Sequence, residues 1–156
     1  MKIIFAGGGT AGHVEPALAI ARLWRERNPQ DSLIFLGTAK GLENQLVPAA
    51  NFDLKQIPKV VMPRKISLSV MSAPFAFFNC VLAARKIIKG ADLLIGFGGY
   101  VSAPAYLAAK SLGIPFVVHE ANAKPGFANR LGARLSPNVA VAQAVQGGSL
   151  SNALIT

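Results

Sequence analysis

The sequence predicts an α/β protein with a doubly wound, mainly parallel sheet that carries helices on both faces. Short apolar runs alternate with helical patterns along the 156 residues, an order typical of parallel sheets. Two of the runs lead through glycine-rich turns into helical patterns. Because crossovers between parallel strands are right-handed, the chain would wind into a Rossmann-like domain that binds ligands beyond the carboxyl ends of its strands.

The predicted strands are short apolar runs that end at glycine or polar residues. In chain order they are Lys2–Ala6, Ser32–Leu36, Leu54–Ile57, Leu93–Gly96, Phe116–His119 and Val139–Ala142. Their brevity and apolar character are typical of strands that are buried on both faces.

Helical patterns fill the segments between these strands. In order they cover about Pro16–Asn28, Leu42–Ala50, Leu68–Lys89, Pro104–Leu112 and Phe127–Leu135. The first is the best signalled, because the missing N–H of Pro16 would be unpaired in a first turn anyway. Ala17, Ala21 and Trp24 share one face of this helix, and Pro29 ends it.

Length and composition favour one ordinary domain. A chain of 156 residues with 52% hydrophobic residues can bury a sizeable core. The single Cys80 excludes an intramolecular disulfide and favours a reducing compartment. Because the longest apolar segment is broken by polar residues and Pro74, we expect no transmembrane helix.

The net charge of +9 favours an anionic partner. A nucleic acid, an acidic membrane surface and a phosphorylated substrate would each fit. The basic residues are spread along the chain, and arginine-rich or aromatic-interleaved RNA motifs are absent from the sequence. We therefore expect no nucleic-acid partner.

Three polar loops follow strand ends and would share one edge of the sheet. The first is Gly7–His13, the second is Gly96–Ser102 and the third is His119–Asn122. A glycine turn before a helix exposes backbone N–H groups to an anion, most often a phosphate. Two such turns suggest a diphosphate-bearing substrate, and His13 at the lip of the first could take a proton.

The first glycine turn also has a second interpretation. Gly7, Gly9 and Gly12 satisfy the dinucleotide fingerprint G-x-G-x-x-G. The fingerprint also needs an acidic residue near the end of the second strand, here at Thr38, to bind a ribose hydroxyl, and the sequence shows none there. Lys40 follows that strand and would instead favour a ribose 2′-phosphate. An NADP-dependent oxidoreductase domain is therefore kept as an alternative.

The polar side chains at this edge have alternative roles. His13 and His119 are the two histidines of the sequence, and each is either a site residue or a satisfied structural residue. Glu120 either acts as a base or sugar-hydroxyl acceptor, or accepts backbone N–H bonds. Asn122 either binds a ligand or caps a turn. Because position 123 is alanine, the HExxH spacing is absent and we expect no metal site.

The segment 59–89 combines apolar and basic side chains. One interpretation is a buried helix with solvated ends. The other is an exposed apolar patch, rimmed by basic residues, that meets an anionic membrane surface. The residues of this predicted membrane patch are Arg64, Lys65, Val70, Met71, Phe75, Phe78 and Arg85.

Taken together, the motifs resemble those of the MurG family of bacterial N-acetylglucosaminyltransferases. The segment Gly8–His13, followed by Pro16, resembles the first glycine loop of the family, and Gly98–Pro104 resembles the second. The segment His119–Asn122 resembles the His-Glu-Gln-Asn segment of the family. The match covers essentially the whole chain, in order and at suitable spacing.

The resemblance implies one half of a two-domain GT-B enzyme. Residues 1–146 would form the acceptor- and membrane-binding domain, and residues 147–156 would begin an interdomain linker. A C-terminal donor-binding domain would act in cis or in trans. The implied reaction moves N-acetylglucosamine from UDP-GlcNAc to lipid I, which carries a muramoyl pentapeptide on undecaprenyl diphosphate, at the cytoplasmic face of the plasma membrane. No cofactor is implied, and the isolated half is expected to be inactive.

The expected site residues follow from the loops and from this resemblance. His13 is the candidate general base, and Glu120 is the loop organiser or an alternative base. The residues expected to bind substrate are Gly9, Thr10, Ala11, Gly12, Gly98, Gly99, Tyr100, Ser102, His119 and Asn122.

Three positions depart from the family pattern. Ala11 and Ala103 stand where the family usually has glycine, and Ala121 stands where it usually has glutamine. The added methyl groups narrow the approach of the backbone to a phosphate, and the lost amide removes one hydrogen bond. A lipid- or diphosphate-binding module that performs no transfer by itself is the second functional hypothesis.

Overall fold

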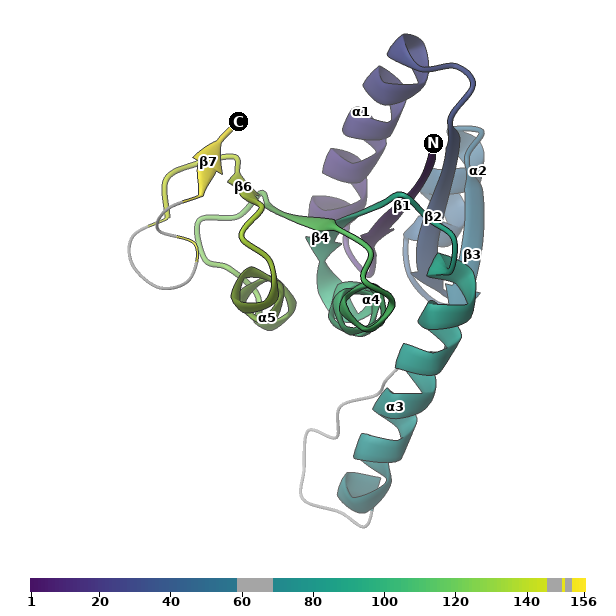
Figure 1. The fold of residues 1–156 in the computed structure, drawn as a ribbon, viewed down its shortest axis with the longest axis vertical. Helices are drawn as coiled ribbons and strands as arrows, with labels where there is room; N and C mark the ends of the chain where they lie inside the picture. The colour runs from purple at the N-terminus through teal and green to yellow at the C-terminus, as the bar shows by residue number, and fades with distance from the viewer. Residues whose placement is uncertain (59–68, 146–149, 151–152) are drawn as a thin grey trace.

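A parallel sheet organises the computed structural model, which describes residues 1–58, 69–145, 150 and 153–156 (Figure 1). Within these residues the seven strands run in the order β3-β2-β1-β4-β5-β6-β7, and every neighbouring pair is parallel. The strands are β1 (Lys2–Gly7), β2 (Ser32–Thr38), β3 (Asp53–Ile57), β4 (Leu93–Gly98), β5 (Phe116–Glu120), β6 (Val139–Val141) and β7 (Leu154–Ile155). The chain moves outward from β1 to β3 and then returns to β4 beside β1, which confirms the doubly wound fold.

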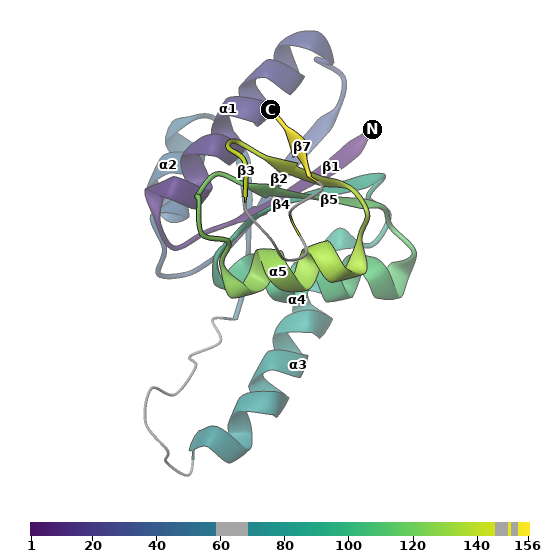
Figure 2. The same cartoon turned by 90° about the vertical axis from the view of Figure 1, so that its left-hand side faces the viewer.

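Helices cover both faces of the sheet. They are α1 (Ala11–Arg27), α2 (Glu43–Ala49), α3 (Ser69–Ile88), α4 (Gly99–Leu112) and α5 (Phe127–Leu135). Figure 2 shows α1 and α2 on one side and α3, α4 and α5 on the other. The sheet is therefore the middle layer of three.

The core lies in two parts because β1 is apolar on both faces. Ile3 and Phe5 pack with residues of α1 and α2, whereas Ile4 and Ala6 pack with residues of α3 and α4. Alternate side chains of a strand point to opposite faces, so an unbroken apolar run fills both halves. This explains why the strand lacks the polar alternation of a half-exposed sheet.

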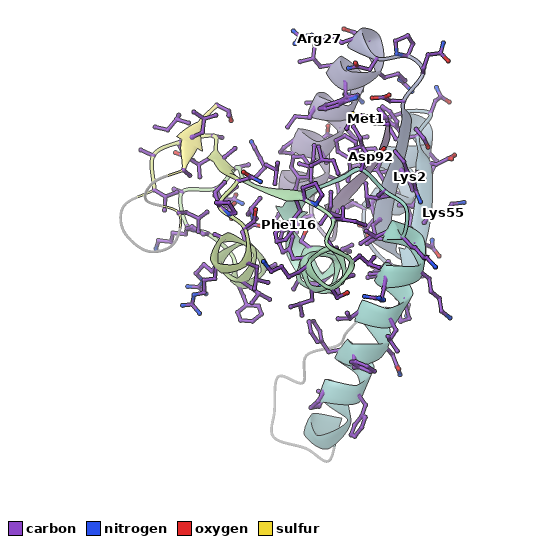
Figure 3. All side chains as sticks on the ribbon, viewed as in Figure 1. Met1, Lys2, Arg27, Lys55, Asp92 and Phe116 are labelled. Atoms are coloured by element: carbon purple, nitrogen blue, oxygen red, sulfur yellow. The ribbon has the colours of Figure 1, made fainter. Side chains whose placement is uncertain are left out.

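The amino ends of β1 and β4 are tied together at the edge opposite the glycine loops. The backbone N–H of Lys2 donates to Asp92 Oδ2 at 2.7 Å, and the backbone N–H of Asp92 donates to the carbonyl of Lys2 at 2.8 Å (Figure 3). These reciprocal bonds fix the register of the two strands. Their carboxyl ends therefore finish side by side.

Two helices begin five residues earlier than the sequence predicted. The helices α1 and α4 start at Ala11 and Gly99, so that Pro16 and Pro104 each occupy the sixth helical position. The first-turn position predicted for Pro16 and the helix start predicted at Pro104 were wrong, because each helix starts inside the glycine turn itself. Glycine has low helix propensity and hides such a start from a sequence pattern.

Two further features differ from expectation or extend it. Leu154–Ile155, inside the segment expected to begin a linker, pairs with β6 as the edge strand β7. The amino-terminal half of α3 extends away from the rest of the structure (Figures 1 and 2). Among the described residues, none of the helices combines the length and apolarity needed to cross a membrane.

Candidate functional site

The carboxyl ends of β1, β4 and β5 lie side by side and bring the three predicted loops to one edge. The strand β4 lies between β1 and β5, and Gly7 pairs with Gly98 across a register shift at the end of β1. The predicted convergence of the loops is confirmed. It lies where the strand order reverses, which is the usual ligand position in such sheets.

The two glycine loops touch each other directly. Gly99 has φ +78°, and a Cβ atom placed on it would collide with the carbonyl oxygen of Gly8. A Cβ atom on Gly98, at φ +95°, would lie 3.1 Å from His13 Nε2. The ring of Tyr100 covers the first loop, since a Cβ atom on Gly9 would lie 2.8 Å from Tyr100 Cε2. Glycine is therefore required by both backbone conformation and space.

His13 lies at the junction of these loops and is held through one ring nitrogen. Its Nδ1 lies 3.2 Å from the carbonyl oxygen of Gly8 and 3.1 Å from Thr10 Oγ1. A carbonyl oxygen only accepts, so Nδ1 carries the proton. The lone pair of the neutral imidazole is then on Nε2, beside Gly98. This is the form of histidine that can accept a proton.

The first turn of α1 offers backbone donors. Ala11 and Gly12 are exposed, and their N–H groups have no acceptor within the described parts of the chain. The N–H of Gly9, by contrast, already donates to Glu43 Oε2 at 2.9 Å. Of the amides predicted to cradle an anion, that of Gly9 is therefore used internally, and those of Ala11 and Gly12 remain for a ligand.

Glu43 is a site residue that sequence analysis missed. Its carboxylate is fully buried and accepts the Thr38 N–H at 2.9 Å and the Thr38 hydroxyl at 3.2 Å, in addition to the Gly9 N–H. The expectation that no acid stands near the end of β2 was wrong, because the chain folds back and brings this side chain onto Thr38. The sequence feature that could have pointed to Glu43 is its position as an acidic residue in the first turn of a helix.

Glu120 is buried at the centre of the third loop. One carboxylate oxygen accepts the backbone N–H and the Nδ2–H of Asn122, both at 2.9 Å. The other accepts Gly126 N–H at 3.2 Å and Asn129 Nδ2–H at 3.0 Å. The loop from Glu120 to Gly126 is therefore wound around this carboxylate. Asn122 itself is exposed, with its amide nitrogen directed to Glu120.

Asn129 and Tyr106 connect the third loop to the interior. The Tyr106 hydroxyl donates to Asn129 Oδ1 at 2.8 Å, and Asn129 Nδ2 also donates to the carbonyl of His119 at 3.0 Å. Both side chains are fully buried, and burial raises the pKa of Tyr106, which stays a neutral donor. Neither Asn129 nor Tyr106 was among the expected site residues, because their hydrogen-bond partners come from other segments of the chain.

Two of the expected substrate-binding residues are buried behind the loops. Ser102 Oγ lies 2.7 Å from the carbonyl of Ala6 and 2.8 Å from that of Gly98, and it accepts the Gly98 N–H at 3.0 Å. This hydroxyl is committed to holding the ends of β1 and β4 together. His119 is 8% exposed.

The His119 ring packs against Phe97, at 5.3 Å between ring centroids. Its Nδ1 is buried and has no hydrogen-bond partner within the described residues. Burial lowers the pKa of His119, while the nearby Glu120 charge opposes this shift. His119 is therefore neutral at neutral pH.

In the predicted membrane patch the two phenylalanines are exposed, whereas Arg85 is half-buried. Phe75 is 74% exposed and Phe78 is 58% exposed, and both lie on one face of α3 with the exposed Leu82. Arg85 instead donates to the backbone carbonyl of Ser111 on α4 at 3.1 Å. Four residues of the predicted patch lie wholly or partly outside the described residues: Arg64 and Lys65 entirely, and Val70 and Met71 in their side chains.

The fold and its paired glycine loops define a Rossmann-like domain with a ligand site at the carboxyl ends of its strands. The glycosyltransferase family 28 N-terminal domain matches residues 3–141, so the chain belongs to this family. Among the described residues, no group of three His, Cys, Asp or Glu side chains lies close enough to hold a metal ion.

Curated relatives narrow the resemblance within the family. The chain is 53% identical over 141 residues to the UDP-N-acetylglucosamine–N-acetylmuramyl-(pentapeptide) pyrophosphoryl-undecaprenol N-acetylglucosamine transferase of Thermobifida fusca, covering 89% of this chain and 37% of that protein. It is 55% identical over 141 residues to the transferase of the same name from Frankia casuarinae, covering 89% and 38%. The MurG resemblance is thereby confirmed.

A solved structure agrees with the sequence comparison. The crystal structure of MurG from Acinetobacter baumannii is similar at a TM-score of 0.78 and 34% identity, over 90% of this chain and 40% of that one. The chain thus spans less than half the length of the relatives it matches.

Proposed function

We propose that this chain is the acceptor-binding half of an inverting N-acetylglucosaminyltransferase. The reaction would move N-acetylglucosamine from UDP-GlcNAc to the 4-hydroxyl of the muramoyl sugar of lipid I, giving lipid II for peptidoglycan synthesis. The observation that carries the proposal is His13, fixed at the junction of two glycine loops with Nε2 as its proton acceptor. The related transferases of Thermobifida fusca and Frankia casuarinae, which are named for this transfer, support the same reaction.

The acceptor diphosphate would bind at the start of α1. The exposed N–H groups of Ala11 and Gly12 and the positive end of this helix favour an anion there. The loop at Gly98 and Gly99 would close the other side. We also assign Thr10, Ala11, Gly12 and Asn122 contacts with the UDP-GlcNAc donor. The net charge of +9 would attract both diphosphates.

In this mechanism His13 Nε2 takes the proton of the acceptor 4-hydroxyl. The freed oxygen bonds to the anomeric carbon of N-acetylglucosamine, the bond from that carbon to the diphosphate oxygen breaks, and UDP leaves with the electron pair. Attack from the opposite face inverts the anomeric centre. Glu120 holds the third loop through its four hydrogen bonds and does not take the proton.

The remaining components would lie outside this half. Residues 1–146 would form the acceptor domain, and residues 147–156 would lead toward a C-terminal donor-binding domain that acts in cis or in trans. The alternative, a lipid- or diphosphate-binding module without transfer, differs in one respect. If the chain is half of a transferase, addition of a separate donor-binding domain should restore sugar transfer. If it is a binding module, no transfer should be detected after the addition.

A titration with a short-chain, soluble lipid I analogue tests acceptor binding. We expect backbone amide NMR shifts confined to Gly7–His13, Gly96–Ser102 and His119–Asn122, because these loops share the proposed site. The same analogue without its diphosphate is the control and should shift these amides far less. Absence of shifts with the complete analogue, together with a response to NADPH, would overturn the proposal in favour of a dinucleotide site.

We further propose peripheral attachment to the cytoplasmic face of the plasma membrane through α3. Exposed Phe75 and Phe78 would insert among lipid tails, and basic residues would meet anionic headgroups.

Replacing both Phe75 and Phe78 with serine is expected to weaken binding to anionic vesicles at least about tenfold, since each buried phenylalanine contributes about 1.5–3 kcal/mol. Co-sedimentation with phosphatidylglycerol vesicles measures the loss. Leu23→Ser removes an exposed apolar side chain from α1, on the other side of the sheet, and should leave vesicle binding unchanged. Equal binding by the double variant and the unaltered chain would exclude α3 as the attachment surface.

A further inference from the structure

We infer that Glu43 is a positioning residue for the transfer reaction, acting on His13 through the peptide group between Gly8 and Gly9. The inference rests on the proposed role of His13 as the base. It assigns a function to a buried carboxylate that lies on the far side of the first glycine loop from His13.

One peptide group is hydrogen-bonded at both ends. Its N–H, from Gly9, donates to Glu43 Oε2 at 2.9 Å. Its carbonyl, from Gly8, accepts from His13 Nδ1 at 3.2 Å. The described residues contain no cis peptide bond, so the N–H and C=O of this group point in opposite directions. The carboxylate and the imidazole therefore lie on opposite sides of the same peptide.

This arrangement lets the carboxylate act on the imidazole without touching it. A negative charge at the N–H end polarises the amide and increases the negative charge on the Gly8 carbonyl oxygen. Hydrogen bonds in such a chain strengthen one another by about 10–30%. The stronger bond stabilises the Nδ1–H tautomer of His13. A carboxylate or carbonyl partner sets the tautomer of catalytic and metal-binding histidines in the same way.

The same chain of bonds stays intact when His13 acts as the base. When Nε2 accepts a proton, the imidazolium keeps donating from Nδ1 to a carbonyl that Glu43 has made more negative. Glu43 is fully buried, so its charge is poorly screened by water. Within the described residues no lysine or arginine forms an ion pair with it, and its partners are the Gly9 N–H and the two Thr38 groups.

Three glycines lie against the Glu43 side chain, and none of them could carry a side chain without meeting it. A Cβ atom on Gly8 would lie 2.8 Å from Glu43 Oε1, and one on Gly37 would lie 2.6 Å from Glu43 Cγ. A Cβ atom on Gly41 would collide with the carboxylate itself. Three glycines from three segments thus enclose one carboxylate, which fixes its position relative to the first loop.

The first test is the tautomer of His13 in Glu43→Gln, read from imidazole 15N shifts. The chain has two histidines, and a His119→Gln background leaves one imidazole to observe. We expect neutral His13 to be mainly Nδ1–H in the background protein. In Glu43→Gln the ratio of Nδ1–H to Nε2–H should fall about 1.2- to 1.7-fold, the change expected when a hydrogen bond worth about 1 kcal/mol loses a cooperative strengthening of about 10–30%. Glu26→Gln, the same change at an exposed position of α1, should leave the ratio unaltered.

A measurement on the unaltered chain covers the case in which Glu43→Gln fails to fold. A scalar coupling across the hydrogen bond, from Gly9 15N to Glu43 13Cδ, should be detectable. Its absence would overturn the inference, as would an unchanged tautomer ratio in a folded Glu43→Gln protein.

Turnover separates this inference from the proposed function. In the complete transferase, Glu43→Gln should lower kcat with little change in the KM for lipid I. If the tautomer ratio falls while kcat of both Glu43→Gln and His13→Ala is unchanged, the coupling stands and the role of His13 as base fails. If kcat depends on His13 and the ratio does not depend on Glu43, the coupling fails and the base stands.

Discussion

Replacing His13 with alanine in the complete two-domain transferase is expected to lower kcat by about 10²- to 10⁴-fold, the usual contribution of a general base. The reason is geometric. Nδ1 is fixed by the Gly8 carbonyl, so the Nε2 lone pair is held in one place at the junction of the loops. Steady-state transfer to a soluble lipid I analogue, with the donor saturating, measures the loss.

His13→Asn is the matched control for this prediction. Asparagine places an amide N–H near the position of Nδ1 and can keep the bond to the Gly8 carbonyl, but it has no nitrogen lone pair at the position of Nε2. We expect its kcat to fall as far as that of His13→Ala, with the loop retained in amide NMR spectra. Unchanged turnover in either variant would remove His13 from the role of base.

Replacing Gly99 with alanine is expected to destabilise the domain by about 2–5 kcal/mol. About 1–2 kcal/mol comes from forcing a Cβ into left-handed backbone, where Gly99 has φ +78°. A further 1–3 kcal/mol or so comes from the collision with the Gly8 carbonyl, which forces the two glycine loops apart. Urea unfolding followed by circular dichroism measures the free energy of unfolding.

Gly113→Ala isolates the second contribution. Gly113 also has left-handed backbone, at φ +68°, but no atom lies within 4 Å of the position its Cβ would take. It should lose only the conformational part, about 1–2 kcal/mol. Folded Gly99→Ala protein should also bind the lipid I analogue more weakly than Gly113→Ala. Equal effects of the two substitutions would contradict a direct contact between the loops.

Local pattern was enough to predict most of the fold. Apolar runs such as that around Ile4 are typical of strands buried on both faces, and the alternation of such runs with helical patterns favours parallel strands joined by crossovers. Pattern was weaker at helix starts, where α1 and α4 begin inside the glycine turns and carry Pro16 and Pro104 in their second turns. Intrinsic propensity opposes such starts, and packing of these helices on the sheet outweighs it.

The candidate site was predictable as a set of loops, but the assignments within it were not. His13 and Glu120 stand out in sequence because each follows a strand beside other polar residues. Glu43 does not, because its partners Gly9 and Thr38 come from other segments. Ser102 was predicted to bind substrate, yet its hydroxyl is committed to the ends of β1 and β4.

The sequence by itself determined the alternation of strands and helices, the three loops at strand ends and the family to which they belong. These features depend on residue type and short-range spacing, which a chain carries before it folds. Only the tertiary structure decided that Gly8 meets Gly99, which nitrogen of His13 is free, and that Glu43 lies behind the first loop. Those facts depend on contacts between segments that are distant in sequence, and strand order and side-chain packing fix them together.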